Sequence, residues 1–478
     1  MRRLSALLAA ATAFSAPAQA APRQISGWAM LARQDVVAAH RLLLANHPGF
    51  VPGVGDVGLR QRERAAYRLA LRRIARVRSL GGYRAVLDRY LTAMHDAHIA
   101  AYPLARPLRV SWPGFLVTTR GDRWTVTQSA GGSAPADGAE WLGCDGRTAE
   151  AIAADRVGSV LPWSLPAHRR TNAAQLMIDR GDPFVTPLRQ CRFAEAGDVR
   201  SITLAWRPLA TAELNALTAR AAGLAGARFD VRTAPDGALW IGYGEMSDRV
   251  QPVLAALDGA PAQLARAPYV VVDVRGNGGG DSRVGDALVQ RLFPNSPTTV
   301  PTDDPGFQSW RASPGNAAAL RQSARDSAAD AAWLLPLASE MDRAVAAHRA
   351  FVTPLPPRPW PQPRAAAPSG DPSTARILLL TDPTCFSSCL VLVDQLRRLG
   401  AAQIGLPTDG STPYLSGRFV ELPSGLSRMI VMQVLGVGGD RLAQPFAPAA
   451  TFAGDMRNDD QLMAWVAGLR RATQGGSR

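Results

Sequence analysis

A run of apolar residues that ends in three glycines constrains the fold of this chain more than any other feature. Residues 269–274 read Tyr-Val-Val-Val-Asp-Val, and Asn277 is followed by glycines at 278–280. Such a run of β-branched and aromatic residues is typical of a strand buried on both faces of a parallel sheet. Glycines allow positive φ and leave backbone amides uncovered. The stretch predicts a central strand whose end holds an anion: a phosphate, a carboxylate or the oxyanion of acyl transfer.

The pattern on either side of this strand alternates strands with helices. Further strands are predicted at 238–244, 375–381, 402–405, 418–422 and 428–434, and helices at 248–257, 285–293, 388–399 and 459–473. Alternation of this kind is typical of an α/β fold with a mostly parallel sheet. We therefore expect an α/β core built from residues 230–300 and 375–478.

Three other regions flank or interrupt this core. Residues 21–105 have helical periodicity, with helices expected at 35–46, 63–77 and 83–98, which predicts an N-terminal helical region. Residues 106–229 have the two-residue period of strands and form a β-rich region with a helix at 211–226. Residues 301–374 form a proline-rich insertion around a helical stretch at 316–350.

The N-terminus is typical of a secretory signal. Two arginines precede a short apolar run, and Ala18-Gln19-Ala20 provides a small-residue cleavage site, so residues 1–20 are predicted to be a signal peptide. The run is too short to span a bilayer, and no later stretch approaches the roughly 20 apolar residues required. We expect an exported protein, periplasmic or extracellular, without stable membrane insertion.

The charge of the chain is positive, but its distribution argues against nucleic acid as a partner. All 53 basic residues are arginine, and the net charge is +14. The arginines are scattered, and no nucleic-acid-binding motif accompanies them. The oligomeric state is not indicated by the sequence.

Four cysteines suit an oxidising compartment. Cys385 and Cys389 are four residues apart and can bridge at a helix start, while Cys144 and Cys191 can bridge within the β-rich region. Free buried thiols are the alternative for each pair.

A serine pair between a predicted strand and a predicted helix is the second candidate for chemistry. Ser387 and Ser388 begin the helix after the strand at 375–381. The amides at a helix N-terminus favour a nucleophile whose attack creates an oxyanion nearby. The alternative is that one of the serines only caps the helix.

The third candidate is Met94-His-Asp-Ala-His98. Histidine is suited to proton transfer near neutral pH, so His95 and His98 are candidate general bases. Metal ligation by both histidines with Asp96 has no supporting metal motif, and ordinary residues at a helix end are a further alternative. No metal and no cofactor are predicted.

These features together resemble the C-terminal processing, or tail-specific, serine peptidases, especially their tricorn-like branch. Asp273-Val-Arg-Gly-Asn-Gly-Gly-Gly280 resembles the most diagnostic motif of the family, Thr381-Asp-Pro-Thr-Cys-Phe-Ser-Ser388 its nucleophile segment, and Asp96-Ala-His98 its histidine motif. Asn46-His-Pro-Gly49 and Asn458-Asp-Asp-Gln-Leu462 are weaker matches. The resemblance implies a crotonase/ClpP-like core, and residues 138–152 faintly resemble the last part of a PDZ domain.

The resemblance also implies roles for individual residues. Ser387 would be the nucleophile and His98 the base, and the amides of Gly278 or Gly279 and of Ser388 would form the oxyanion hole. A Ser-Lys mechanism, common in bacterial members, is excluded because the chain has no lysine and arginine stays protonated. A polypeptide would be the substrate, with unstructured or C-terminal segments preferred.

Two departures from the family leave the group that orients His98 unidentified. Leu390 stands where the family usually has glutamate, and Gln444-Pro445 stands where an acidic residue before proline is common. Asp96 is a possible supporting residue. A catalytically inactive protein that binds a peptide or apolar ligand, as interphotoreceptor retinoid-binding protein does with this fold, is the alternative function. A nucleotide-binding domain is a third, although Gly276-Asn-Gly-Gly-Gly280 lacks the complete fingerprint.

Overall fold

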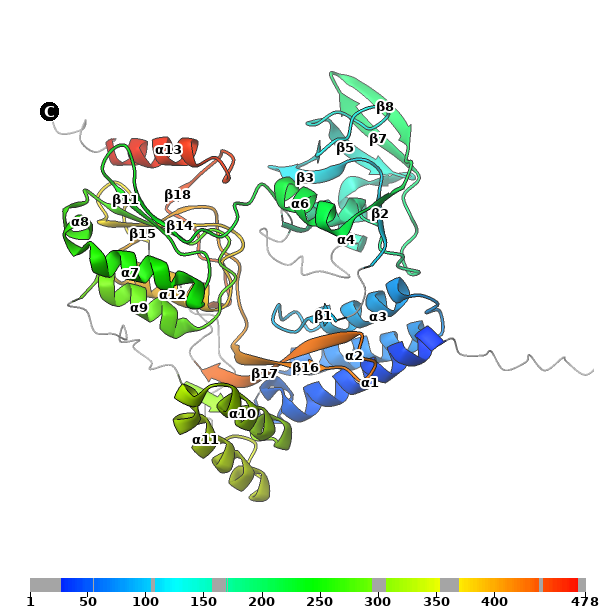
Figure 1. The fold of residues 1–478 in the computed structure, drawn as a ribbon. Helices are drawn as coiled ribbons and strands as arrows, with labels where there is room; N and C mark the ends of the chain where they lie inside the picture. The colour runs from blue at the N-terminus through cyan, green and yellow to red at the C-terminus, as the bar shows by residue number, and fades with distance from the viewer. Residues whose placement is uncertain are drawn as a thin grey trace, which may run out of the picture.

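The computed structural model describes residues 27–54, 56–104, 108–156, 169, 171–294, 307–352, 369–437 and 442–471. The predicted signal peptide at 1–20 lies outside these ranges, and so do parts of the predicted insertion at 301–374. Figure 1 shows an α/β unit, a β-rich unit, and an N-terminal group of helices joined to the α/β unit by a long hairpin.

The α/β unit is built on a six-stranded sheet of order β10-β11-β12-β14-β15-β18. Its strands are β10 (Val231–Thr233), β11 (Leu239–Gly242), β12 (Val270–Asp273), β14 (Ile377–Thr381), β15 (Ala402–Gly405) and β18 (Ala450–Thr451). All neighbours in this order are parallel except β10 and β11. β12 lies inside the sheet and is buried along its whole length, as its apolar run predicts.

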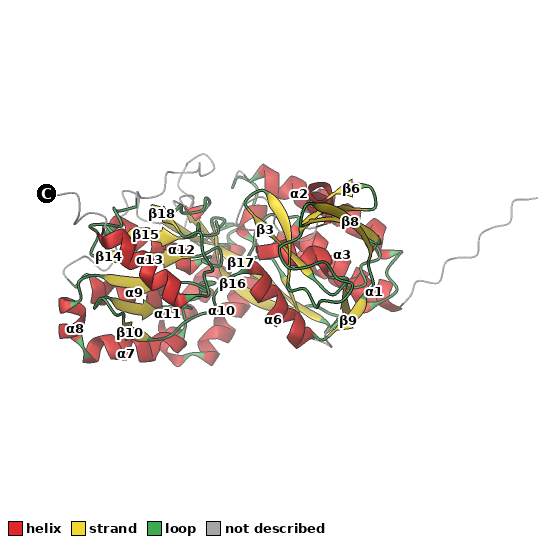
Figure 2. Cartoon of the chain, turned by 90° about the horizontal axis from the view of Figure 1, so that it is seen from above, coloured by secondary structure: helices red, strands yellow, loops and turns green. Residues whose placement is uncertain are grey.

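Helices cover both faces of this sheet (Figures 1 and 2). The helical segments are η3 (Asp248–Val250), α7 (Gln251–Gly259), α8 (Pro261–Arg266), α9 (Ser282–Leu292), α12 (Ser388–Arg398) and α13 (Asp459–Arg471). Val270 and Val272 pack in one core with α7, α9 and α12, while Val271 packs in a second core with α13. The alternation of side chains along the strand thus explains why both faces are apolar.

The N-terminal region is helical, as predicted. It contains α1 (Gly27–Asn46), the short helix η1 (Pro48–Phe50), α2 (Val57–Ile74) and α3 (Leu80–Thr92). α1, α2 and α3 share one apolar core.

Part of the sequence that was predicted to belong to the α/β core packs on these helices instead. β16 (Tyr414–Glu421) and β17 (Ser427–Val437) form an antiparallel hairpin in a separate sheet with β1 (Ala101–Pro103) and β13 (Phe307–Trp310). Met429, Val431 and Leu435 of β17 lie in the core of α1–α3. The prediction that all of 375–478 belongs to the α/β core is therefore wrong for this hairpin, because its apolar face is buried against the helices.

The helical stretch of the insertion forms two helices. α10 (Pro314–Asp326) and α11 (Ala328–Ala346) pack against each other around a small core that includes Leu320 and Met341. Ser313 and Asn316 hydrogen-bond to Asn46, which attaches this pair to the end of α1.

The β-rich region has its own core, one six-stranded sheet and one two-stranded sheet. Its strands are β2 (Val110–Trp112), β3 (Leu116–Arg120), β4 (Arg123–Thr127), β5 (Glu140–Cys144), β6 (Arg147–Thr148), β7 (Gln190–Glu195), β8 (Asp198–Thr203) and β9 (Arg207–Leu209), and its helices are α4 (Ala149–Arg156), η2 (Ala173–Met177) and α6 (Thr211–Ala222). Cys144 and Cys191 are directly opposite on β5 and β7 and form a disulfide.

The architecture is therefore mixed α/β with several sheets. Within the part of the chain that the structure describes, no helix is both long and apolar enough to cross a bilayer.

Candidate active site

Ser387 lies in a sharp turn between β14 and α12. Its backbone has φ 56° and ψ −124°, values that L-residues rarely adopt and that occur mainly where function demands them. Ser387 occupies the N-cap position of α12, but its side chain makes no capping hydrogen bond. Instead, Ser387 Oγ lies 3.1 Å from His98 Nε2. The capping alternative is thus wrong for this residue, because its hydroxyl points at an imidazole.

His98 lies in a loop rather than at the end of a helix. The predicted helix at 83–98 ends early, since α3 stops at Thr92, and His95 then adopts φ 55°. The guanidinium group of Arg62 hydrogen-bonds to the Met94 carbonyl and holds the start of this loop. His95 is exposed, so of the two candidate bases the structure brings only His98 to Ser387.

Asp96 fixes the orientation of His98. Asp96 Oδ1 accepts the backbone N–H of His98 at 2.9 Å and lies 3.2 Å from His98 Nδ1. Burial alone would raise the pKa of the Asp96 carboxyl, but contacts with His47 and His98 outweigh it and hold the pKa well below its usual range. An ionised carboxylate accepts the Nδ1 proton of a neutral imidazole, which leaves Nε2 free to accept the proton of Ser387.

The two positions at which the sequence departs from the family pattern carry no acidic residue that could orient His98. Leu390 is fully buried in the core of the α/β unit, and Gln444 is exposed. The carboxylate that contacts His98 comes instead from two residues before it in the chain. Among the described residues, no group of three or more histidine, cysteine or acidic side chains is placed to hold a metal ion.

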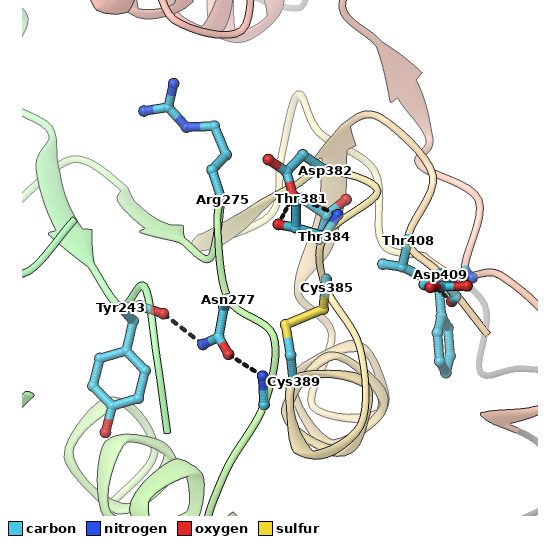
Figure 3. Close-up of a disulfide and its surroundings, with 12 residues drawn as sticks. Tyr243, Arg275, Asn277, Thr381, Asp382, Thr384, Cys385, Cys389, Thr408 and Asp409 are labelled. Atoms are coloured by element: carbon cyan, nitrogen blue, oxygen red, sulfur yellow. Dashed lines mark hydrogen bonds between the residues drawn. A yellow bond between two sulfur atoms is a disulfide. The ribbon is translucent and has the colours of Figure 1, made fainter. Parts of the chain in front are cut away.

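The glycine loop after β12 lies against the turn of Ser387. Asn277 is fully buried; its side-chain N–H donates to the Tyr243 carbonyl at 2.7 Å, and its Oδ1 accepts the Gly279 amide at 2.9 Å (Figure 3). The Gly279 amide is therefore occupied. For the amides of Gly278 and Ser388, no hydrogen bond is found among the described residues. This role of Asn277 was not predicted, although an amide side chain directly before glycines is a usable signal.

Two of the glycines are required by space and by backbone conformation. A Cβ atom at Gly279, where φ is +98°, would lie 2.7 Å from the Phe386 carbonyl oxygen and 2.8 Å from Ser387 Cβ. At Gly280, φ is +137° and a Cβ would overlap the Met246 carbonyl. A Cβ at Gly278 would meet nothing within 4 Å. At Gly279 the loop thus approaches the Ser387 turn too closely for a side chain.

Side-chain hydrogen bonds of Arg275 and Ser388 link the glycine motif to two helices of the α/β unit. Arg275 is fully buried, and its Nε donates to Asp273 at 2.8 Å while its terminal nitrogen donates to Asp459 of α13 at 3.0 Å. Ser388 Oγ donates to the Gly280 carbonyl at 2.6 Å and joins the loop to α12. Two motifs that are far apart in the sequence therefore meet in one polar cluster.

A disulfide joins the residues on either side of the Ser387 turn. Cys385 and Cys389 are bonded, which decides between the bridge and free thiols at this pair, and both are fully buried (Figure 3). Together with the second disulfide, it leaves no free cysteine among the described residues. The covalent link spans Ser387 and restrains the two ends of its unusual turn.

The two disulfides should differ in the property that they affect most, one stability and the other activity. Chain entropy predicts that the Cys144–Cys191 bridge stabilises the fold by about 4 kcal/mol and the shorter Cys385–Cys389 bridge by about 2 kcal/mol. We expect the alanine pair at 385 and 389 to lower kcat of any hydrolysis at Ser387 by about 10–100-fold, because the turn loses its restraint.

The alanine pair at 144 and 191 is the matched control and should lower the unfolding midpoint more but leave kcat near that of the wild type. Urea unfolding and steady-state kinetics of both variants test this. Equal losses of kcat would mean that the bridge beside Ser387 has no local role.

Comparison with known proteins gives a match in structure alone. No protein-family model matches the sequence, and no curated protein matches it significantly. The crystal structure of mature CPAF matches with a TM-score of 0.59 and 14% identity, over 94% of this chain and 99% of that chain. Mature CPAF complexed with lactacystin matches with a TM-score of 0.59 and 14% identity, over 94% of this chain and 100% of that chain.

A third structure, of a serine-to-alanine variant of CPAF, matches with a TM-score of 0.57 and 14% identity, over 93% of this chain and 98% of that chain. These matches include the β-rich region and the helical region as well as the α/β unit, since they cover nearly all of both chains. The chain described here therefore has the fold of mature CPAF.

Proposed function

We propose that this protein is an exported serine peptidase of the C-terminal processing family, with Ser387 as the nucleophile and His98 as the general base. The observation that carries the proposal is the 3.1 Å distance between Ser387 Oγ and His98 Nε2, at a turn with positive φ. A serine aimed at an imidazole, which is in turn oriented by a carboxylate, is the arrangement that activates a hydroxyl for acyl transfer. The α/β unit would be the crotonase/ClpP-like core of that family.

The geometry supports a sequence of steps for peptide hydrolysis. Ser387 Oγ attacks the carbonyl carbon of the scissile bond while its proton moves to His98 Nε2, and the imidazolium is stabilised by Asp96. The carbonyl oxygen becomes an oxyanion. His98 then gives the proton to the leaving amine, and water hydrolyses the acyl-enzyme with His98 acting again as base.

The oxyanion would be held by the amides of Gly278 and Ser388. Each preorganised donor in such a site contributes roughly 2.7–4 kcal/mol to lowering the barrier. Gly279 is a weaker candidate, because its amide already donates to Asn277. Its place is steric, since it lets the loop approach Ser387.

The proposed substrate class rests on the resemblance of the sequence motifs to this family. We propose that polypeptides are cleaved within unstructured or C-terminal segments. The alternative function is binding of a peptide or apolar ligand in the same site without turnover.

Labelling of the purified protein by a fluorophosphonate tests the proposal. We expect one adduct per chain, located by mass spectrometry at Ser387, absent in Ser387→Ala and retained in Ser388→Ala, together with cleavage of an unstructured polypeptide by the wild type. Ser388→Ala is the matched control because the neighbouring hydroxyl donates to the Gly280 carbonyl and not to a histidine. Folded wild-type protein that neither labels nor cleaves, but binds peptide saturably, would favour the alternative.

A further inference from the structure

His47 is a buried histidine that the proposed mechanism does not use. It belongs to Asn46-His47-Pro48-Gly49, the segment between α1 and η1, and its side chain is fully buried. His47 caps η1 with φ −81° and ψ 130°, the extended conformation favoured before proline. The backbone thus fixes where this imidazole points.

The hydrogen bonds of His47 define its tautomer. Its Nδ1 accepts the backbone N–H of Gly49 at 3.1 Å, so this nitrogen carries no proton. In the neutral ring the proton must then be on Nε2. The Nε2 N–H of His47 is therefore a hydrogen-bond donor, on the opposite side of the ring from the Nδ1 atom that caps η1.

This donor faces the carboxylate that orients His98. His47 Nε2 lies 3.9 Å from Asp96 Oδ2, and both atoms are buried without a hydrogen-bond partner among the residues that the structure describes. The distance is about 1 Å longer than an N–H···O hydrogen bond. A buried N–H donor and a buried carboxylate oxygen that both lack partners gain free energy when they move together into a hydrogen bond.

The surroundings leave the two groups few other partners. The His47 ring packs edge-on against Tyr414 at 4.4 Å and against Phe50 at 5.5 Å between ring centroids. The Tyr414 hydroxyl donates to Asp56. Asp96 Oδ1 is already occupied by two contacts from His98, so only Oδ2 can accept from His47.

We propose that His47 is a positioning residue, which donates from Nε2 to Asp96 Oδ2 in the working enzyme and so holds the carboxylate that orients His98. This inference rests on the proposed peptidase function. Catalytic hydrogen bonds are often long in ligand-free structures and shorten when substrate binds, which is consistent with the 3.9 Å separation. His47 then belongs to a chain of four side chains that ends at Ser387.

Two amide substitutions separate this role from a purely structural one. Asparagine in His47→Asn places its oxygen near the position of Nδ1 and keeps the cap on Gly49, but lacks the distant donor. Glutamine in His47→Gln places its N–H near the position of Nε2 and keeps the donor, but loses the cap. We expect His47→Asn to lower kcat by about 10–100-fold with KM little changed, and His47→Gln to recover most of kcat despite a lower melting temperature.

Opposite rankings are expected from the two roles. If His47 only caps η1, His47→Asn will behave as the wild type and His47→Gln will be the damaged variant, which would overturn the inference. His40→Asn is the control, because it removes another histidine of the helical region whose Nδ1 lies 2.6 Å from Glu63; it should lower stability but leave kcat unchanged. A wild type without Ser387-dependent turnover would instead overturn the proposed function, and this inference with it.

Discussion

Alanine at Ser387 and alanine at His98 are each expected to lower kcat/KM by roughly 10⁴–10⁶-fold, and the double variant is expected to lose no more than either single variant. The reason is that in the proposed mechanism the two side chains act as one unit. Without the imidazole, the hydroxyl keeps its proton, and without the hydroxyl, the imidazole has no proton to accept. Additive losses are expected only for groups that act independently.

The measurement is a steady-state assay of the two single variants and the double variant against one unstructured polypeptide, with folding checked by circular dichroism. His95→Ala is the matched control, since His95 is exposed and belongs to the same loop as His98. It should retain nearly full activity. A double variant that is far slower than both single variants would show that Ser387 and His98 contribute to separate steps.

Alanine at Gly279 is expected to lower kcat by about 10²-fold or more, through the shape of the nucleophile turn rather than through any lost functional group. The new methyl group would lie 2.8 Å from Ser387 Cβ and 2.7 Å from the Phe386 carbonyl oxygen, at a φ of +98° that alanine rarely adopts. Relief of this overlap must move Ser387 or the glycine loop. A displacement of about 1 Å is enough to lose 10²-fold in rate.

Gly285→Ala is the control for this variant. Gly285 lies in α9, also packs on α12, and a Cβ there would find its nearest atom, Leu392 Cβ, at 3.6 Å, which is ordinary contact. It should fold and react like the wild type, and it can gain stability from a better helix former. Fluorophosphonate labelling rates and kcat of both variants are to be compared. Normal labelling of Ser387 in Gly279→Ala would mean that the loop adjusts without disturbing the nucleophile.

The α/β unit could be predicted from the sequence because its signals are local. β12 and β14 are continuous apolar runs that need two buried faces, and the glycines after β12 require an unusual backbone whatever the tertiary context. Residue types alone suggested Ser387 or Ser388 and His95 or His98 as candidates, and the resemblance to the family singled out Ser387 and His98. Their distance depends on how two regions dock, and no local pattern contains that information.

Other features depend on tertiary contacts and were predicted wrongly or not at all. The apolar residues of β17 have the same pattern as those of any buried strand. The sequence therefore did not indicate that β17 packs on the N-terminal helices rather than in the α/β unit. α3 ends at Thr92 because the following loop is held by Arg62 and Asp96, residues with no helix-breaking signature. The packing of His47 toward Asp96 is likewise a consequence of the folded loop and not of spacing.

The hairpin of β16 and β17 has a consequence for when the chain first becomes active. β17 pairs with β1, and Ile430 donates to the Ala100 carbonyl, two residues beyond His98. Ser387 is 289 residues further along the chain than His98, and the hairpin that secures the histidine loop is made later still. If both residues act as proposed, a chain emerging from the ribosome has its base long before its nucleophile, and β17, which pairs beside the histidine loop, emerges after both. Proteolytic activity would then arise only after the nucleophile and the hairpin have been synthesised, long after the base.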